Sequence, residues 1–123
     1  MSDTHKGVLV DPYTKTITNV QVGDFKDIQK HLQCSVFCSG GRDEGGDAIY
    51  VNDEGLYTES MFWYAPDLYP DPYAGRVLFL GIDAGGNSAD SFLDAEDLED
   101  IDAKFMTRAE VEGMYSQWSK YHG

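Results

Sequence analysis

Residues 76–82 read Arg-Val-Leu-Phe-Leu-Gly-Ile, a run that is almost entirely apolar. A strand with one face in water alternates apolar and polar residues, whereas a strand covered on both faces is apolar throughout. The run therefore predicts a central strand of a sheet that is buried on both faces.

A hairpin is predicted ahead of this strand, near the start of the chain. Residues 8–10 are apolar and indicate a first strand, and residues 16–22 indicate a second. Between them, residues 11–14 (Asp-Pro-Tyr-Thr) are typical of a turn, because proline presets φ and the aspartate can bond the backbone ahead of it.

Two further elements are expected after the hairpin. Asp24 can cap a helix that ends near His31 and buries an apolar stripe of Phe25, Ile28 and Leu32. Residues 34–38 then indicate a strand, and the glycine-rich residues 40–46 indicate a polar loop.

A second hairpin is predicted in the middle of the chain. Residues 47–51 and 56–58 flank Asn-Asp-Glu-Gly at 52–55, where the glycine is available for a positive φ.

The clearest helix is predicted at residues 107–121. Thr107 and Glu110 have the spacing of a capping box. A wide apolar stripe follows at helical spacing, formed by Val111, Met114, Tyr115, Trp118 and Tyr121. Together the elements predict a single α+β domain over residues 1–123. We expect an antiparallel or mixed sheet, a short helix after the first hairpin and a C-terminal amphipathic helix packed on the sheet.

The charge balance restricts the partners of the protein. Nine Lys and Arg residues stand against 22 Asp and Glu residues, which gives a net charge of -13. This charge opposes direct binding to nucleic acid or to an anionic membrane, and it favours attraction to basic partners. No long apolar run is present, and Cys34 and Cys38 on one strand would be about 13 Å apart, too far for a disulfide. A reduced, cytoplasmic protein is expected.

No known catalytic, metal or cofactor motif is found. Cys34 and Cys38 lack a second thiol pair, and the three histidines are far apart in sequence, so we expect no metal site. Residues 83–94 fail the calcium-loop pattern, because position six is Ser88 and position twelve is Asp94. A calcium site of another kind at Asp83, Asn87 and Asp90 is left as a minor alternative. Phosphate-binding and nucleophile motifs are also missing, so we assign no catalytic residue and no cofactor.

The acidic segment, residues 94–102, reads Asp-Ala-Glu-Asp-Leu-Glu-Asp-Ile-Asp. As a helix over 94–105 it would bury a narrow stripe of Leu98, Ile101 and Phe105, although residues 101–105 also alternate like a strand. The helix would carry one charge per roughly 2.3 Å of axis, close to the value of roughly 1.7 Å for duplex DNA. It is either an ordinary solvated face or a surface for a basic groove.

The stretch 61–73 holds five aromatic residues and three prolines. Residues 61–65 are expected to form a strand that feeds the core. The loop at 67–73 is expected to be exposed, where Tyr69 and Tyr73 could contact a partner.

Three segments together resemble a known family: residues 6–20 (KGVLVDPYTKTITNV), 52–56 (NDEGL) and 74–81 (AGRVLFLG). They are similar to the small phage and bacterial proteins of domain-of-unknown-function family 3846, over roughly residues 7–110. The resemblance implies a cytosolic α+β domain, often carried by phages, with no established activity and no catalytic residue to transfer. The stretches 61–73 and 94–102 depart from its pattern.

Two hypotheses on function follow. The first is a non-enzymatic, acidic binding protein that engages a basic protein, such as a nucleic-acid-binding host protein. Its candidate contact residues are Asp94, Glu96, Asp97, Glu99, Asp100, Asp102, Tyr69 and Tyr73. The second is a small enzyme or ligand-binding domain with a site near the loop at 61–73, which a pocket with converging polar groups would favour.

Overall fold

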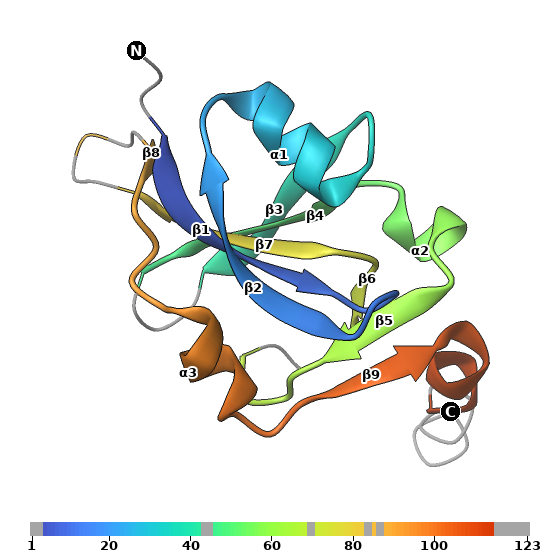
Figure 1. Cartoon of the computed structure of the whole chain (residues 1–123). Helices are drawn as coiled ribbons and strands as arrows, with labels where there is room; N and C mark the ends of the chain where they lie inside the picture. Colours follow the sequence, from blue (N-terminus) through green and yellow to red (C-terminus); the bar gives the residue numbers. More distant parts are fainter. Residues whose placement is uncertain (1–3, 43–45, 69–70, 83–84, 86–87, 115–123) are drawn as a thin grey trace.

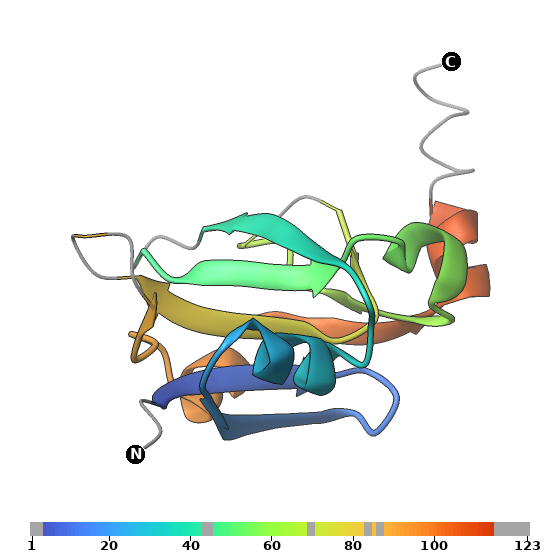
Figure 2. The same cartoon turned by 90° about the horizontal axis from the view of Figure 1, so that it is seen from above.

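Two antiparallel β-sheets lie face to face, and one helix covers the outer face of the larger sheet (Figure 1, Figure 2). The arrangement is that of a computed structural model, which describes residues 4–42, 46–68, 71–82, 85 and 88–114. Hairpins and short helices are mixed along the chain, so the predicted α+β class is confirmed.

The larger sheet is built around β7 (Val77–Ile82), the strand predicted from residues 76–82. Its strand order is β2-β1-β7-β4-β3, and β8 pairs with the end of β7. The other strands of this sheet are β1 His5–Asp11, β2 Thr16–Val22, β3 Phe37–Arg42, β4 Ala48–Asn52 and β8 Ser88–Ala89. β7 therefore has a hydrogen-bonded neighbour on each side, as expected of a central strand.

Both faces of β7 are covered, which explains its apolar sequence. Val77 and Phe79 face the smaller sheet, where Phe79 meets Trp63 edge-on with ring centroids 6.1 Å apart. Leu78 and Leu80 face the opposite way and pack on the helix α1 (Phe25–Leu32). All four β7 side chains are at most 1% exposed, so the prediction of a strand buried on both faces is confirmed.

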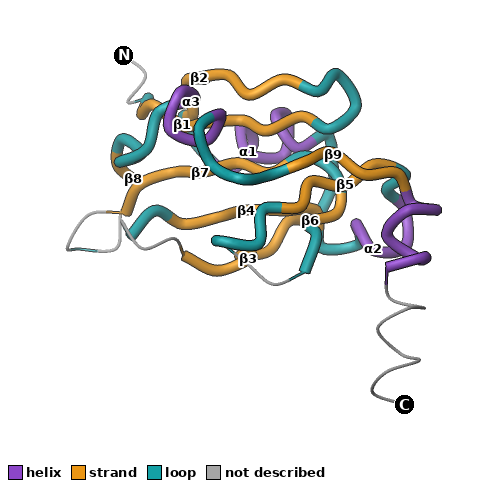
Figure 3. The backbone as a smooth tube through the Cα atoms, turned by 90° about the horizontal axis from the view of Figure 1, so that it is seen from below, coloured by secondary structure: helices purple, strands orange, loops and turns teal. Residues whose placement is uncertain are grey.

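The smaller sheet has the order β6-β5-β9 and lies across the larger one, with the helix α3 beside β2 (Figure 3). Its strands are β5 Met61–Tyr64, β6 Tyr73–Ala74 and β9 Lys104–Thr107, and α3 spans Ala95–Glu99. Trp63 points inward at 1% exposure, whereas Phe62 packs on the other face beneath residues 108–114. The expected core strand at 61–65 is thus confirmed.

The first hairpin and its helix form as predicted, with one exception. Asp11 Oδ1 accepts a hydrogen bond from the Tyr13 N–H at 2.9 Å, and the Asp24 side chain caps α1 by accepting from the N–H groups of Lys26 and Asp27. Phe25 is 59% exposed, so its predicted place in the core is wrong. It is the first helical residue and lies beyond the reach of the sheet that buries Ile28 and Leu32.

The strand predicted at residues 34–38 is wrong in its first half. Gln33 ends α1 in the left-handed region at φ 53°, and the Cys34 N–H donates to the Gln29 carbonyl at 3.2 Å. This closing turn occupies the backbone that a strand would need. β3 begins only at Phe37 and continues through Gly40 and Gly41, where the sequence predicts a loop.

The hairpin predicted around residues 52–55 is also wrong. Residues 55–58 form a single helical turn, α2 (Gly55–Thr58), in place of a second strand. The Asn52 side chain accepts from the Glu54 N–H at 3.0 Å, and Thr58 Oγ1 donates to the Glu54 carbonyl at 3.1 Å. These local bonds favour a turn over a strand ladder.

The C-terminal helix begins where the capping box predicts. Residues 108–114 are helical, the Thr107 N–H donates to Glu110 Oε1 at 3.1 Å, and the Glu110 N–H donates to Thr107 Oγ1 at 3.3 Å. Val111 is buried against the outer face of the smaller sheet. Residues 115–121, with Tyr115, Trp118 and Tyr121, lie outside the described residues.

Candidate functional site

The acidic segment forms a short helix followed by a turn and a strand. α3 ends at Glu99, so a helix over 94–105 is wrong. Residues 104–107 pair with β5 instead. This pairing buries Met106 on one face of the smaller sheet and partly buries Phe105 on the other. The inward side of the segment is as expected: Leu98 is 1% exposed, and Ile101 and Phe105 pack against the same cluster.

All six carboxylates of the segment are exposed, but two of them stabilise the fold. Asp97 accepts a hydrogen bond from the Asp94 N–H at 2.8 Å, which closes the first turn of α3. Asp94 also forms an ion pair with Lys6 of β1. The remaining carboxylates have no hydrogen bond or ion pair with any described residue; we call these four the acidic ridge: Glu96, Glu99, Asp100 and Asp102.

Of the two tyrosines predicted as contact residues, Tyr69 and Tyr73, only Tyr73 is among the described residues. Tyr73 lies in β6 at 5% exposure and stacks on Trp63 with centroids 6.2 Å apart, so it belongs to the core. Because a buried ring offers little surface to a partner, we leave Tyr73 out of the contact surface proposed below. Tyr69 lies outside the described residues.

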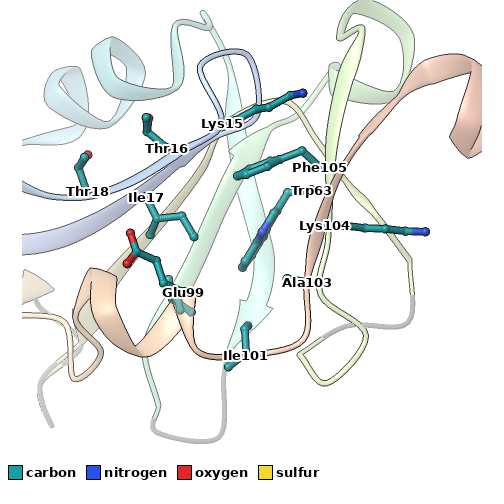
Figure 4. Close-up of a pocket in the computed structure, with 11 residues that line it drawn as sticks. Lys15, Thr16, Ile17, Thr18, Trp63, Glu99, Ile101, Ala103, Lys104 and Phe105 are labelled. Atoms are coloured by element: carbon teal, nitrogen blue, oxygen red, sulfur yellow. The ribbon is translucent and has the colours of Figure 1, made fainter.

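A cavity of about 380 Å³ lies between β2, β5, β9 and the acidic segment (Figure 4). Trp63 of β5 lies at its centre, with Phe105 of β9 above it. Leu98, Glu99 and Ile101 form the wall contributed by the acidic segment. The two regions singled out in the sequence, 61–73 and 94–102, therefore meet at one place in the fold.

The far wall and rim of the cavity come from residues to which the sequence points only weakly. Ile17 of β2 points toward the acidic segment across the cavity, whereas its exposed neighbours Thr16 and Thr18 point the other way along the strand. Lys15 and Lys104 lie at the rim. Lys15 is in the hairpin turn at φ 58°. The one sequence signal for the β9 wall is the alternation of Ile101, Ala103 and Phe105, which favours a strand.

The β9 wall of the cavity is an open strand edge. The Arg108 N–H donates to the Ser60 carbonyl at 3.0 Å, which fixes the hydrogen-bonded pairs between β5 and β9. Since such pairs alternate along an antiparallel ladder, the Trp63–Phe105 pair is a non-hydrogen-bonded one. The backbone N–H and C=O of Phe105 therefore point away from β5, toward the edge where no further strand pairs among the described residues.

The β2 wall is an open edge as well. The Gln21 carbonyl lies 3.0 Å from the His31 ring, and the opposite residue, Lys6, uses its backbone groups to bond Asp90 and Ser91. The Lys6–Gln21 pair is therefore non-hydrogen-bonded, and by alternation so is Val10–Ile17. The Ile17 N–H and C=O thus point outward from the sheet on the side of the cavity. Two strand edges that pair with no other described strand therefore flank one cavity.

A buried polar cluster occupies another part of the molecule. The Glu59 residue is 8% exposed; its carboxylate accepts a hydrogen bond from the Tyr13 hydroxyl and one from Asn52 Nδ2 at 3.1 Å. The Arg76 guanidinium lies over the Tyr13 ring at 4.7 Å. We call this set the Glu59 cluster: Tyr13, Asn52, Glu59 and Arg76. Tyr13 and Asn52 bond the Glu59 carboxylate, and Arg76 Nε donates to Asp11 at 3.3 Å. We interpret the cluster as a structural tie between the turn after β1, the end of β4 and the segment before β5.

Within the described part of the chain, no three His, Cys, Asp or Glu side chains gather as metal ligands would. None of the helices described there has the length and apolarity that a bilayer crossing requires.

The fold and the cavity define a small, two-sheet α+β domain whose open strand edges flank a cavity. Residues 5–105 match the family described as a domain of unknown function (DUF3846), and the chain belongs to this family. The resemblance in sequence is thereby confirmed, and the family description assigns no activity. No curated protein and no solved structure matches the chain.

Proposed function

We propose that the protein is a non-enzymatic binding protein that engages a basic segment of a protein partner at the acidic ridge and the adjoining cavity. The observation that carries the proposal is the position of the cavity, one wall of which is the acidic segment itself. A basic segment laid there would place cationic groups beside exposed carboxylates and apolar groups beside the half-buried Ile101 and Phe105. Contact surfaces commonly combine such an apolar centre with a polar rim.

The net charge of the chain supports the same reading. A charge of -13 steers a basic partner toward the protein, and this attraction weakens with salt, because the screening length is about 10 Å at 0.1 M ionic strength. A partner from the class of nucleic-acid-binding host proteins carries the required basic surface. The sequence resemblance leads us to expect a phage-borne protein, whose partner would then be a host protein.

The proposal is tested with a panel of lysine- and arginine-rich peptides, whose binding is followed by fluorescence polarisation at 50 and 300 mM salt. The variant Asp100→Asn with Asp102→Asn removes two ridge charges. We expect it to weaken binding about fivefold, because an exposed ion pair contributes roughly 0.5 kcal/mol.

A matched control keeps the change in net charge the same. Asp53→Asn with Glu54→Gln removes two exposed carboxylates next to α2, where no cavity residue lies. We expect this control to change binding less than twofold. Equal losses in both variants would show that only net charge matters, and the proposed site would then be wrong.

A second candidate, a small-ligand site, is favoured by the size of the cavity. Its volume of about 380 Å³ falls in the range of small-molecule sites, and two cationic side chains, Lys15 and Lys104, stand at its rim. A panel of anionic and aromatic metabolites, screened by the shift in melting temperature, tests this candidate, because a ligand of the native state raises that temperature. A panel without any shift would argue against it.

A further inference from the structure

We propose that the cavity is an edge-strand site, in which an extended segment of the partner adds to the smaller sheet beside β9 at Phe105. The inference deepens the proposed function and rests on it. Its basis is the pair of backbone groups of Phe105 that point to the open edge of β9 and meet no partner among the described residues. An added strand satisfies such groups with main-chain hydrogen bonds, which is a common mode of peptide recognition.

The position of the cavity explains why the partner would bind here and not at another edge. A strand added to β9 would lie about 4.8 Å from it, on the side of the cavity that faces β2. No residue of β3, which forms the far edge of the larger sheet, lines this cavity. The half-buried side chains of Ile17 and Phe105 provide an apolar surface along the proposed path.

The side-chain alternation of a strand predicts the sequence of the occupant. The Phe105 side chain faces inward with Trp63, so a residue paired with Phe105 would also face inward and should be apolar. The neighbouring residues of the occupant would face outward, where Asp102 and Lys104 are exposed. The inferred ligand is therefore an extended peptide that alternates apolar and polar residues, with a cation beside Asp102.

A substitution of Lys104 tests this inference, because it should strengthen the binding of a basic peptide. A cation opposite Lys104 in the added strand would meet a like charge, which is unfavourable across a strand pair. Lys104→Glu should therefore tighten binding of an eight-residue, end-capped peptide that alternates valine and lysine. The control Lys26→Glu makes the same charge change on an exposed residue of α1, and we expect it to have a smaller effect.

Backbone methylation of the same peptide tests the hydrogen bonding directly. In one peptide the odd-numbered amides are N-methylated, and in the other the even-numbered amides are. We expect one of the two peptides to lose about tenfold in affinity, which corresponds to about 1.4 kcal/mol, and the other to lose much less. Equal effects of the two patterns would overturn the edge-strand inference.

Amide hydrogen exchange of the protein supplies a second readout. On saturation with the peptide, the Phe105 N–H should exchange more slowly, whereas those of Lys104 and Met106, already bonded to β5, should change little. Binding of the peptide with unchanged exchange at Phe105 overturns this inference and leaves the proposed function standing. Failure of every basic peptide to bind overturns both.

Discussion

Gly75→Ala tests the geometry of the Glu59 cluster. Gly75 has a φ of +74°, a conformation that residues with a Cβ rarely adopt. A Cβ at this position would stand 2.5 Å from Glu59 Cδ, closer than any real contact. The substitution therefore carries two costs, one from its own backbone and one from displacing a carboxylate that bonds Tyr13 and Asn52.

The two costs can be estimated separately. Placing an L-residue in the left-handed region costs roughly 1–2 kcal/mol. Displacing the carboxylate weakens hydrogen bonds to a buried charged group, at roughly 1.5–3 kcal/mol. We expect Gly75→Ala to lower the free energy of unfolding by about 3 kcal/mol, measured by urea unfolding. This is a large share of the roughly 5–15 kcal/mol that holds a domain together.

Two comparisons separate the causes. Gly46→Ala is the matched control. Gly46 has a φ of +94°, and no heavy atom lies within 4 Å of the position that a new Cβ would take. The substitution should therefore carry the backbone cost alone. In a Glu59→Ala background, Gly75→Ala should likewise cost only about 1–2 kcal/mol. If Gly75→Ala costs the same with and without the Glu59 side chain, the close approach is not the cause and the reasoning is refuted.

Three further substitutions address other parts of the molecule. Asp47→Asn should lower the free energy of unfolding by about 2 kcal/mol, measured with urea. The buried carboxylate accepts hydrogen bonds from the N–H groups of Phe92 and Leu93 at 2.8–3.1 Å. A loss below about 0.5 kcal/mol would contradict this prediction. Leu98→Ala should cost roughly 2–5 kcal/mol by the same measurement and should also weaken peptide binding, since Leu98 is both core and cavity wall. Hydrogen bonds from Thr107 lower the pKa of Glu110 below its ordinary value of 4.5, so its contribution is present above that pH and lost as the pH falls. Backbone chemical shifts of residues 108–114 should follow this titration, and Glu110→Gln should abolish it.

The elements that are predicted correctly from the sequence are those whose conformation is set by residues within the element itself. The apolar run 77–82 can only be a doubly covered strand, and Asp24 and the Thr107–Glu110 box start their helices locally. The predictions are wrong where a local hydrogen bond stabilises a turn, although the apolar pattern indicates a strand. Cys34 continues the end of α1, and residues 55–58 close a helical turn around Asn52 and Glu54.

The candidate site is only half predictable for a related reason. The acidic segment is identified by its own composition, and its inward residues Leu98 and Ile101 by helical spacing. The open edges at Ile17 and Phe105 depend on which strand lies next to which, and this order is not encoded in any short stretch. The core strand at 61–65 is predicted from the sequence, but the place of Trp63 at the centre of a cavity arises only when β2, β5 and β9 come together.

The pairing of β1 with β7 has a consequence for synthesis in the cell. Val8 lies opposite Phe79, so once Val8 has been made, β1 must wait for about 70 further residues before its partner strand β7 exists. At roughly 5–20 residues per second, a ribosome needs roughly 4–14 s to supply them. During that interval the apolar side chains of β1 have no sheet to join. Until β7 is made, the nascent N-terminal hairpin therefore presents apolar side chains that a chaperone can bind.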